Sequence, residues 1–430
     1  MAESLRRSTS PLAEKLSRED SCPHKGTSAL ASNQADQAAS HTAAGVPNGI
    51  ETDWDPRSAE VLRDQRAAYD SMRERCPVAF SEFMHWSLFR HEDIERALLD
   101  HETFSNAVSQ HLTVPNGMDP PEHTAYRAII DRCFTPERVD AFAPVCRGIA
   151  ADLVRNMLGR DEVELIADLA LPFSVYVQCA HLNWPTTLHE PLIRWTRRNY
   201  EANLKRDRHI TSEIAREFEA LIDDMIEARS QGQSKPEDDL TAVLLNERVW
   251  GRPLSNEEIA SILRNWTVGE IGSISAAVGI VAYYLAQHVD LQQQLRTQPS
   301  LLDAAIDEIL RMFGPLVANR RITTRPVEIG GRKIGAGERI SLMWIAGNRD
   351  GRVFDDPDSF RLDRDPAKNL LYGAGVHVCP GAPLARLELR MITEELLRQT
   401  TAIEPVPGKT PVNAIFPSSG YATLPLCIKR

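Results

Sequence analysis

One cysteine, Cys379, occupies a position where its sulfur could act as a nucleophile or as a metal ligand. It ends the glycine-containing segment YGAGVHVC (372–379), and APLARLELRMITEELLR follows two residues later with the apolar spacing of a helix. The start of a helix directs amide N–H groups and the positive end of its dipole at a nearby sulfur, which favours the thiolate. Gly373 and Gly375 permit a tight turn and a close approach to a large flat ligand. We therefore expect a reactive or metal-bound thiolate.

Two other interpretations of Cys379 compete with the role of metal ligand. A lone cysteine near a helix start is commonly a small buried apolar residue. A cysteine nucleophile could use the same loop, but it needs a histidine general base, for which His377 is the nearest candidate. The residues that flank the cysteine have to separate these possibilities.

The flanking residues resemble the haem-binding loop of the cytochrome P-450 family, F-G-x-G-x-H-x-C-x-G. Tyr372 replaces the usual phenylalanine, and every other position matches. The resemblance implies that Cys379 is the axial ligand of the iron of haem b (iron protoporphyrin IX), with Tyr372 and Gly373 among the cofactor contacts. In the family pattern His377 donates to a haem propionate, which explains this histidine better than a general-base role.

A second segment, PPEHTAYRAIIDRCFTP (120–136), places His123 and Arg127 four residues apart, on one face of a predicted helix. With its flanking prolines it resembles the haem-edge helix of the family. The resemblance implies that His123 and Arg127, together with His377 and Arg321, bind the two haem propionates through charge-assisted hydrogen bonds.

The segment LVANRRITT contains more than one candidate for this contact. Arg321 fits the family pattern best, but Arg320 adjoins it and an assignment one residue earlier stays open. Asn319 falls where many relatives have a further polar propionate contact.

Glu308 and Arg311 lie three residues apart in LLDAAIDEILRMFGP, a spacing that by itself is typical of a solvent-exposed ion pair. Their position upstream of NRDGRVFDDPDSFRLDR and of the cysteine loop resembles the Glu–Arg–Arg network of the family, with Arg364 as the third member. The resemblance implies a buried structural network beneath the haem loop.

The helix predicted over residues 261–288 departs from the family pattern. The pattern A-G-x-D/E-T-T would place an acid before a hydroxyl residue, but the sequence has Gly272 before Ser273. We expect Ser273 to provide the hydroxyl group. We hypothesise that Glu270, one turn earlier, replaces the missing acid in proton delivery. The alternative is that Glu270 points away, into solvent or an ion pair.

The composition limits the class of protein. The 430 residues are 42% apolar and 25% charged, as in ordinary globular proteins, and the net charge of −11 argues against a nucleic-acid binder. We find no apolar leader and no uninterrupted apolar stretch long enough for a bilayer, so we expect no membrane anchor. The seven cysteines are scattered without a C-x-x-C pair, which is typical of a reduced, cytoplasmic protein.

The chain divides into two regions by composition. Residues 1–50 are rich in Ser, Ala, Gln, Thr and Asn and nearly lack aromatic residues, so we expect a disordered N-terminal tail. Residues 51–430 carry helical periodicity over most of their length and strand signals in AFSEFMHWSLFRH and VEIGGRKIGAGERISLMW. We predict one mainly α domain with a small β-region, which by resemblance is the single-domain cytochrome P-450 fold.

The resemblance implies a bacterial-type haem-thiolate monooxygenase, an oxidoreductase. It would insert one oxygen atom from O2 into a C–H bond of a small, moderately apolar organic substrate, by hydroxylation or O-demethylation. We find no dinucleotide-binding fingerprint and no plant-type cysteine run, so we expect a ferredoxin or a flavin/iron–sulfur reductase as electron donor. The helix around Glu270 also resembles haem domains of bacterial members that are fused to such a reductase. A basic docking surface is expected from four arginines on the helices that flank the thiolate side: Arg127, Arg132, Arg386 and Arg390.

Two rival functions remain open. The missing acid at Gly272 also fits a peroxygenase of the same fold that is driven by hydrogen peroxide. A haem-based binder or sensor that performs no chemistry is the second rival, although it would need neither a substrate cavity nor the hydroxyl of Ser273.

Overall fold

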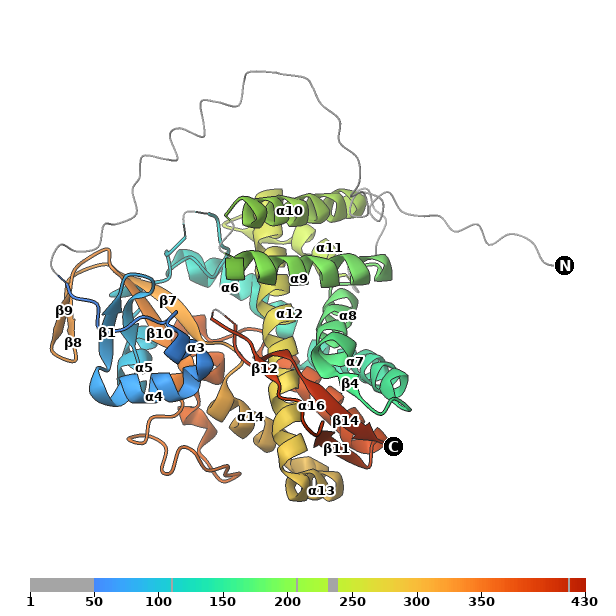
Figure 1. Ribbon diagram of the computed structural model, residues 1–430. Coiled ribbons are helices and arrows are strands. Elements are labelled where there is room, and N and C mark those ends of the chain that lie inside the picture. Colours follow the sequence, from blue (N-terminus) through green and yellow to red (C-terminus); the bar gives the residue numbers. More distant parts are fainter. Residues whose placement is uncertain (1–49, 110, 206–207, 231–238, 417) are drawn as a thin grey trace, which may run out of the picture.

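The computed structural model describes residues 50–109, 111–205, 208–230, 239–416 and 418–430 (Figure 1). The predicted N-terminal tail over residues 1–50 therefore lies, except for its last residue, outside the described part. The described chain forms a helical body with a smaller β-region on one side (Figure 1). The predicted fold class, mainly α with a small β-region, is confirmed.

The helical body is arranged around α12 (Asn256–Gln287), the longest of the described helices. This helix begins with a capping box, in which the side chains of Ser255 and Glu258 each accept a hydrogen bond from the backbone amide of the other residue. The other helices of the body are α6 (Glu122–Asp131), α7 (Pro136–Met157), α8 (Leu171–His181), α9 (His189–Lys205), α10 (Arg208–Ser230), α11 (Leu240–Asn246), α13 (Val289–Thr297), α14 (Leu302–Phe313) and α16 (Ala382–Gln399).

The main sheet of the β-region has the strand order β1-β2-β10-β7-β3. A hairpin of β1 (Val78–Ser81) and β2 (His85–Leu88) pairs in parallel with β10 (Arg339–Met343). On its other side β10 pairs antiparallel with β7 (Ala318–Thr323). The other edge of β7 pairs antiparallel with β3 (Phe104–Ser105). The shorter helices next to this sheet are α3 (Ala59–Arg63), α4 (Gln65–Arg75), α5 (His91–Leu99) and α15 (Trp344–Gly347). The remaining strands are β4 (Val163–Glu164), β5 (Arg248–Val249), β6 (Arg252–Pro253), β8 (Val327–Ile329), β9 (Arg332–Ile334), β11 (Ala402–Pro405), β12 (Val412–Asn413), β13 (Tyr421–Thr423) and β14 (Pro425–Lys429).

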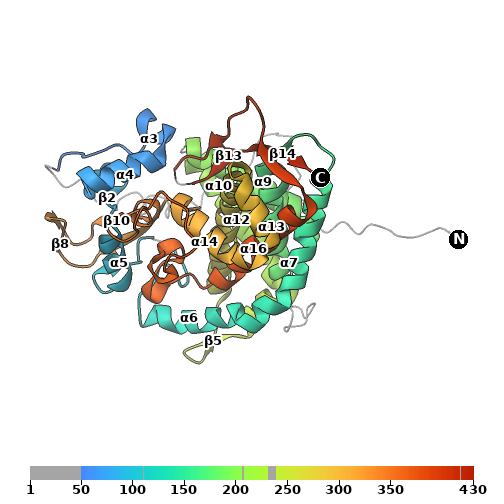
Figure 2. The ribbon, with the colours of Figure 1, turned by 90° about the horizontal axis from the view of Figure 1, so that it is seen from below.

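In two perpendicular views α12 passes through the interior of the molecule (Figures 1 and 2). Buried apolar residues of α7, α8, α14 and α16 pack around it in one continuous core. Within the described part of the chain, α12 is the one helix long and apolar enough to cross a membrane, but 61% of its most apolar window is buried in the protein. This burial is typical of the core helix of a globular protein.

The Glu–Arg–Arg network inferred from the sequence is present. Glu308 Oε2 accepts from Arg311 Nε at 2.7 Å, and Glu308 Oε1 accepts from Arg364 Nε at 2.9 Å. Arg311 is only 1% exposed, and it also donates to the carbonyl of Asn348 at 2.7 Å. Removing one partner would leave a buried charge without compensation, so this network fixes the segment that leads to Cys379 onto α14.

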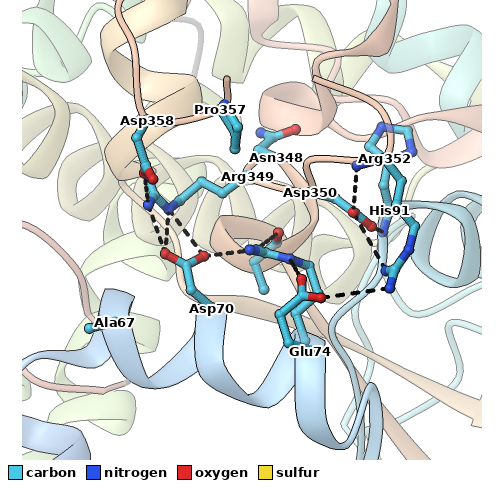
Figure 3. A network of polar contacts seen from close by, with 12 residues as sticks. Ala67, Asp70, Glu74, His91, Asn348, Arg349, Asp350, Arg352, Pro357 and Asp358 are labelled. Atoms are coloured by element: carbon cyan, nitrogen blue, oxygen red, sulfur yellow. Dashed lines mark hydrogen bonds and ion pairs between the residues drawn. The ribbon is translucent and has the colours of Figure 1, made fainter. Parts of the chain in front are cut away.

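A second charged network joins α4 to the segment that follows α15 (Figure 3). Asp70 accepts from two buried arginines, from Arg73 Nη1 at 2.7 Å and from Arg349 Nη2 at 2.7 Å. Arg349 also pairs with Asp358, and Arg73 donates to the carbonyl of Ala346 at 2.8 Å. The N-terminal helices are thereby connected to the chain that precedes the cysteine loop.

Candidate active site

The backbone of the cysteine loop requires glycine at two positions. Gly373 and Gly375 have φ angles of +76° and +70°, in the left-handed region that side chains disfavour. A Cβ atom at Gly375 would also lie 2.5 Å from the carbonyl oxygen of Leu98 in α5. The amide of Cys379 then donates to the carbonyl of Tyr372 at 2.8 Å, which closes the loop immediately before α16.

The sulfur of Cys379 differs from the other described cysteines. Cys133, Cys146 and Cys179 are buried, whereas Cys379 is exposed. Surrounding protein nevertheless raises the pKa of the Cys379 thiol by desolvation, so the sulfur is partly shielded from solvent. The backbone amides of Gly381 and Ala382 oppose this shift and lower the pKa, as predicted for a sulfur at a helix start.

The structure brings together the four basic residues that were predicted to bind propionates. The rings of His123 in α6 and His377 in the cysteine loop lie 4.1 Å apart. Arg127, one turn after His123, donates to the carbonyl of Val376 at 3.2 Å. Desolvation, and then the charges of His123, Arg321 and Arg127, lowers the pKa of His377, so all four residues share one electrostatic environment.

Strand geometry separates Arg321 from its neighbour Arg320. Side chains alternate along β7, and Arg321 is 2% exposed while Arg320 and Asn319 are exposed. The guanidinium of Arg321 donates to the carbonyl of Arg320 at 2.7 Å, and within the described chain no carboxylate pairs with it. Of the three polar candidates in this segment, Arg321 is therefore the one that adds charge to the buried cluster.

Buried ring nitrogens of the two histidines in this cluster lack hydrogen-bond partners within the described chain. Both ring nitrogens of His123 and Nε2 of His377 are buried without one. Desolvation followed by the neighbouring cations lowers the pKa of His377 to about 3, and desolvation lowers the pKa of Arg321 to about 10, although Asp119 offsets part of the latter shift. Buried polar groups are normally satisfied. A ligand with two carboxylates would satisfy these groups, so the residues present fit the propionates of a haem.

Tyr372 lies against α16. Its ring is covered by the guanidinium of Arg386, whose carbon is 4.4 Å from the ring centroid. The hydroxyl group is buried and has no hydrogen-bond partner among the described residues. A Cβ atom at Gly373 would be 3.8 Å from the ring of Trp344, whose indole nitrogen is also buried without a partner. Trp344 was not singled out from the sequence, because nothing in its local pattern marks it.

The middle of α12 has a face that is exposed, although most of the helix is buried. Val268 is 50% exposed, and Gly269 and Gly272 are exposed as well, although the helix runs through the core. Added Cβ atoms at the two glycines would meet nothing within 4 Å. Ser273 donates from its hydroxyl to the carbonyl of Gly269 at 2.7 Å. The central turns of α12 therefore have free space on the face that carries Gly269 and Gly272.

The side chain of Glu270 turns to another side of α12. It meets Gln178 of α8 and Glu388 of α16, and burial raises its pKa to about 8. Neither the exposed position nor the ion pair considered from the sequence describes these surroundings. Sequence reasoning missed Glu388, since a glutamate in a predicted amphipathic helix normally faces solvent.

Comparisons with known proteins agree with this geometry. A family model described as "Cytochrome P450" matches residues 173–425. Cyclomarin C epoxidase CymV of Salinispora arenicola is 31% identical, over 80% of this chain and 89% of its own. Erythromycin C-12 hydroxylase of Saccharopolyspora erythraea is 29% identical, over 78% of this chain and 88% of its own. The solved structure of CYP109E1 from Bacillus megaterium in complex with corticosterone has a TM-score of 0.77 at 25% identity, and covers 86% of this chain and 99% of that one.

The matches extend over most of the described chain, and the predicted single-domain cytochrome P-450 fold is confirmed. Their named activities are epoxidation and hydroxylation. The family implies a haem cofactor. The exposed cysteine, the basic cluster with its unpartnered histidine nitrogens and these relatives together lead to one conclusion: the chain belongs to the cytochrome P450 family, as an oxidoreductase of the monooxygenase type.

Proposed function

We propose that this protein uses haem b to insert one oxygen atom from O2 into a C–H bond of a small, moderately apolar organic substrate, by hydroxylation or O-demethylation. It does so in the cytoplasm, with electrons from a separate ferredoxin or flavin/iron–sulfur reductase. The hydroxylases and epoxidases among the relatives support the reaction class.

One observation supports the cofactor assignment most strongly. Four basic side chains, two of them buried, converge beside the exposed Cys379, and among the described residues only Arg127 of the four pairs with a carboxylate, that of Asp131. Cys379 would hold the iron, and the four residues that would hold the propionates are His123, Arg127, Arg321 and His377. When bound, the haem supplies the activation of O2, and the thiolate ligand favours cleavage of the O–O bond.

The chain's own residues position substrate and protons around that group. Val268 and the two glycines of α12 leave space and an apolar surface on the exposed face of this helix. The hydroxyl of Ser273 can rotate from its bond with Gly269 to hold a water molecule at this surface. Glu270 is the ionisable group nearest along the helix, and we retain it as a proton source that acts through Ser273.

Ion pairs reduce the basic docking surface that was expected for the electron donor. Each of the four arginines expected to form a basic docking surface already pairs with an acid: Arg127 with Asp131, Arg132 with Glu247, Arg386 with Asp307 and Arg390 with Asp303. These pairs neutralise much of the predicted surface.

Spectroscopy of the carbon monoxide complex tests the assignment of Cys379. The reduced protein should absorb at the long wavelength typical of thiolate-ligated haem, Cys379→Ala should lose this band, and Cys427→Ala should keep it. Extraction of the cofactor with acid should release haem b. A thiolate-type band in Cys379→Ala would refute the ligand assignment.

A peroxide-driven peroxygenase is the second candidate function. The open space beside Gly272 and the orientation of Glu270 away from this space favour it, because peroxide brings its own protons and electrons. Turnover with hydrogen peroxide alone, compared with turnover with O2 and a reduced ferredoxin, separates the two functions.

A further inference from the structure

A cleft lies where the helices next to the main sheet meet the helical body. It is lined on one side by the end of α3 and the start of α4, and on the other side by Phe313 of α14 and Tyr421 of β13. Its volume of about 240 Å³ corresponds to about eight water molecules at ~30 Å³ each. A compact organic molecule with one substituted aromatic ring fits into such a space.

The cleft is separate from the candidate active site. None of the residues assigned to the cofactor, or to the exposed face of α12, is among the described residues that line it. An added Cβ atom at Gly420 would lie 3.3 Å from the carbonyl oxygen of Ala276, so the chain before β13 packs directly on α12. Along the helix this contact falls between Ser273 and Ile280, the one α12 residue in the lining.

One side of the cleft is apolar and is held in place by contacts between elements. Ile280 of α12, Val317 and Ile345 of α15 line this side. Gln65 of α4 donates from its side-chain amide to the carbonyl of Ala414 at 3.0 Å, which joins the two sides. The walls are therefore formed before any ligand binds, and they offer an apolar surface to its body.

Arg66 of α4 presents a guanidinium with free donors to the cleft. Its central carbon lies 4.5 Å from the centroid of the Phe313 ring. Stacking on a ring occupies the flat face of a guanidinium and leaves its N–H edges available. Among the described residues, no carboxylate pairs with Arg66 and no acceptor binds its N–H groups. Burial raises the pKa of the Tyr421 hydroxyl and the charge of Arg66 opposes this shift, so the two groups are close to each other.

Positive charge is in excess in this cleft. Arg63, in the last turn of α3, also lines it and has no acid partner in the described chain. The one carboxylate among the described lining residues is that of Asp64, which caps α4 by accepting from the amide of Ala67 at 3.0 Å. Two guanidinium groups thus face one carboxylate that already has a structural role.

We propose that this cleft binds a small organic carboxylate, whose acid group is held by Arg66 and Arg63 and whose body packs on the apolar side. A carboxylate matches the planar fork of a guanidinium and accepts two parallel hydrogen bonds from it. The stacked Arg66 loses little conformational freedom on binding, because its guanidinium is already fixed on Phe313. The site is additional to the haem site, and the proposal does not depend on the reaction that the haem performs.

Calorimetric titration of the haem-containing protein with benzoate tests this site. Benzamide has the same shape without the charge and is the control ligand. Saturating imidazole occupies the open position at the iron and prevents benzoate from binding there. We expect the same affinity for benzoate with and without imidazole, and at least tenfold weaker binding of benzamide. Absence of benzoate binding, its loss in imidazole, or equal binding of benzamide would overturn the proposal.

Substitutions of the arginines locate the bound carboxylate. Arg66→Met keeps an apolar side chain against Phe313 and should weaken benzoate binding at least tenfold, whereas Arg63→Met should weaken it several-fold. The matched control is Arg57→Met, because Arg57 also stacks on a phenylalanine, Phe83 at 4.7 Å, but does not line the cleft. This variant should bind benzoate as the unaltered protein does.

A conservative variant separates the charge of Arg66 from its structural contact. Arg66→Lys keeps the positive charge without the planar fork, so it should bind benzoate more tightly than Arg66→Met and more weakly than the unaltered protein. The thermal midpoint of each variant shows whether it is folded. Unchanged benzoate affinity in a folded Arg66→Met variant, or equal weakening by Arg57→Met, would refute the assigned site.

Discussion

The imidazole rings of His123 and His377 lie 4.1 Å apart and are inclined by 56°, although one belongs to α6 and the other to the loop before Cys379. Burial, and then the positive charge of neighbouring groups that include Arg127, lowers the pKa of both rings, so an anion is needed to keep them protonated. We therefore expect this contact to form one half of a site whose other half is an anionic ligand.

Haem retention should depend on the arginine next to these rings. Arg127→Ala removes a charge-assisted contact, which is typically worth about 1.5–3 kcal/mol. Arg132→Ala removes only the pair with Glu247, in which the arginine side chain is 59% exposed. Transfer of haem to apomyoglobin should be clearly faster for Arg127→Ala than for Arg132→Ala. Equal transfer rates would count against the assignment of α6 to the haem edge.

Gly375 should not tolerate alanine. The substitution forces a side chain into the left-handed region, at a cost of about 1–2 kcal/mol, and drives its Cβ toward the carbonyl of Leu98. Gly408→Ala is the matched control, because Gly408 has a φ of +76° and nothing within 4 Å of an added Cβ. Denaturant unfolding should show a larger loss of stability for Gly375→Ala than for Gly408→Ala. Similar losses would mean that the loop has room for a side chain.

Stability at alkaline pH should depend on the buried carboxyl group of Glu270. Burial raises the pKa of Glu270 from 4.5 to about 8, so the folded protein binds this proton more tightly than the unfolded chain. The resulting stabilisation is complete below pH 4.5 and is lost as the pH rises through about 8. The thermal midpoint of the unaltered protein should therefore fall from pH 7 to 9, and Glu270→Gln should flatten this decline. A decline as steep as that of the unaltered protein would contradict the shift.

A substitution in the Glu308 network should lower the stability of the protein more than a substitution in an exposed ion pair. Arg311→Ala removes one of the two arginines that pair with the buried Glu308. Loss of a partner from a buried ion pair typically costs about 3–5 kcal/mol. Arg361→Ala breaks the exposed pair with Asp363 and should have little effect on unfolding. Calorimetry of the two variants checks this difference, and comparable midpoints would show that the network adds no stability.

The sequence predicts those parts of the site that depend on local spacing. His123 and Arg127 share a face of α6 because four residues complete about one helical turn, and the glycines of the cysteine loop have the conformations that their type allows. The choice between Arg320 and Arg321 required the register of β7 against β10, where Arg321 pairs with Ile340. Adjacent residues of a strand face opposite sides, so an error of one residue exchanges a buried cation for an exposed one.

The direction of Glu270 could not be read from its own helix. The pattern places it within one turn of Ser273, but its side chain contacts residues of α8 and α16 that are distant in the sequence. Which side of α12 accepts a polar group depends on how three helices pack, and that arrangement is a tertiary property. For the same reason, the sequence could not predict that the four arginines expected to form a docking surface pair with acids.

The two ion pairs of Asp70 affect how the protein unfolds. This one carboxylate compensates Arg73 of its own helix and Arg349 of the chain that leads to Cys379 (Figure 3). If α4 separated from the rest of the protein, Arg349 would lose the acid that faces it from α4, although Asp358 would remain. The first helices and the approach to the cysteine loop therefore belong to one cooperative unfolding unit, even though they stand at opposite ends of the sequence.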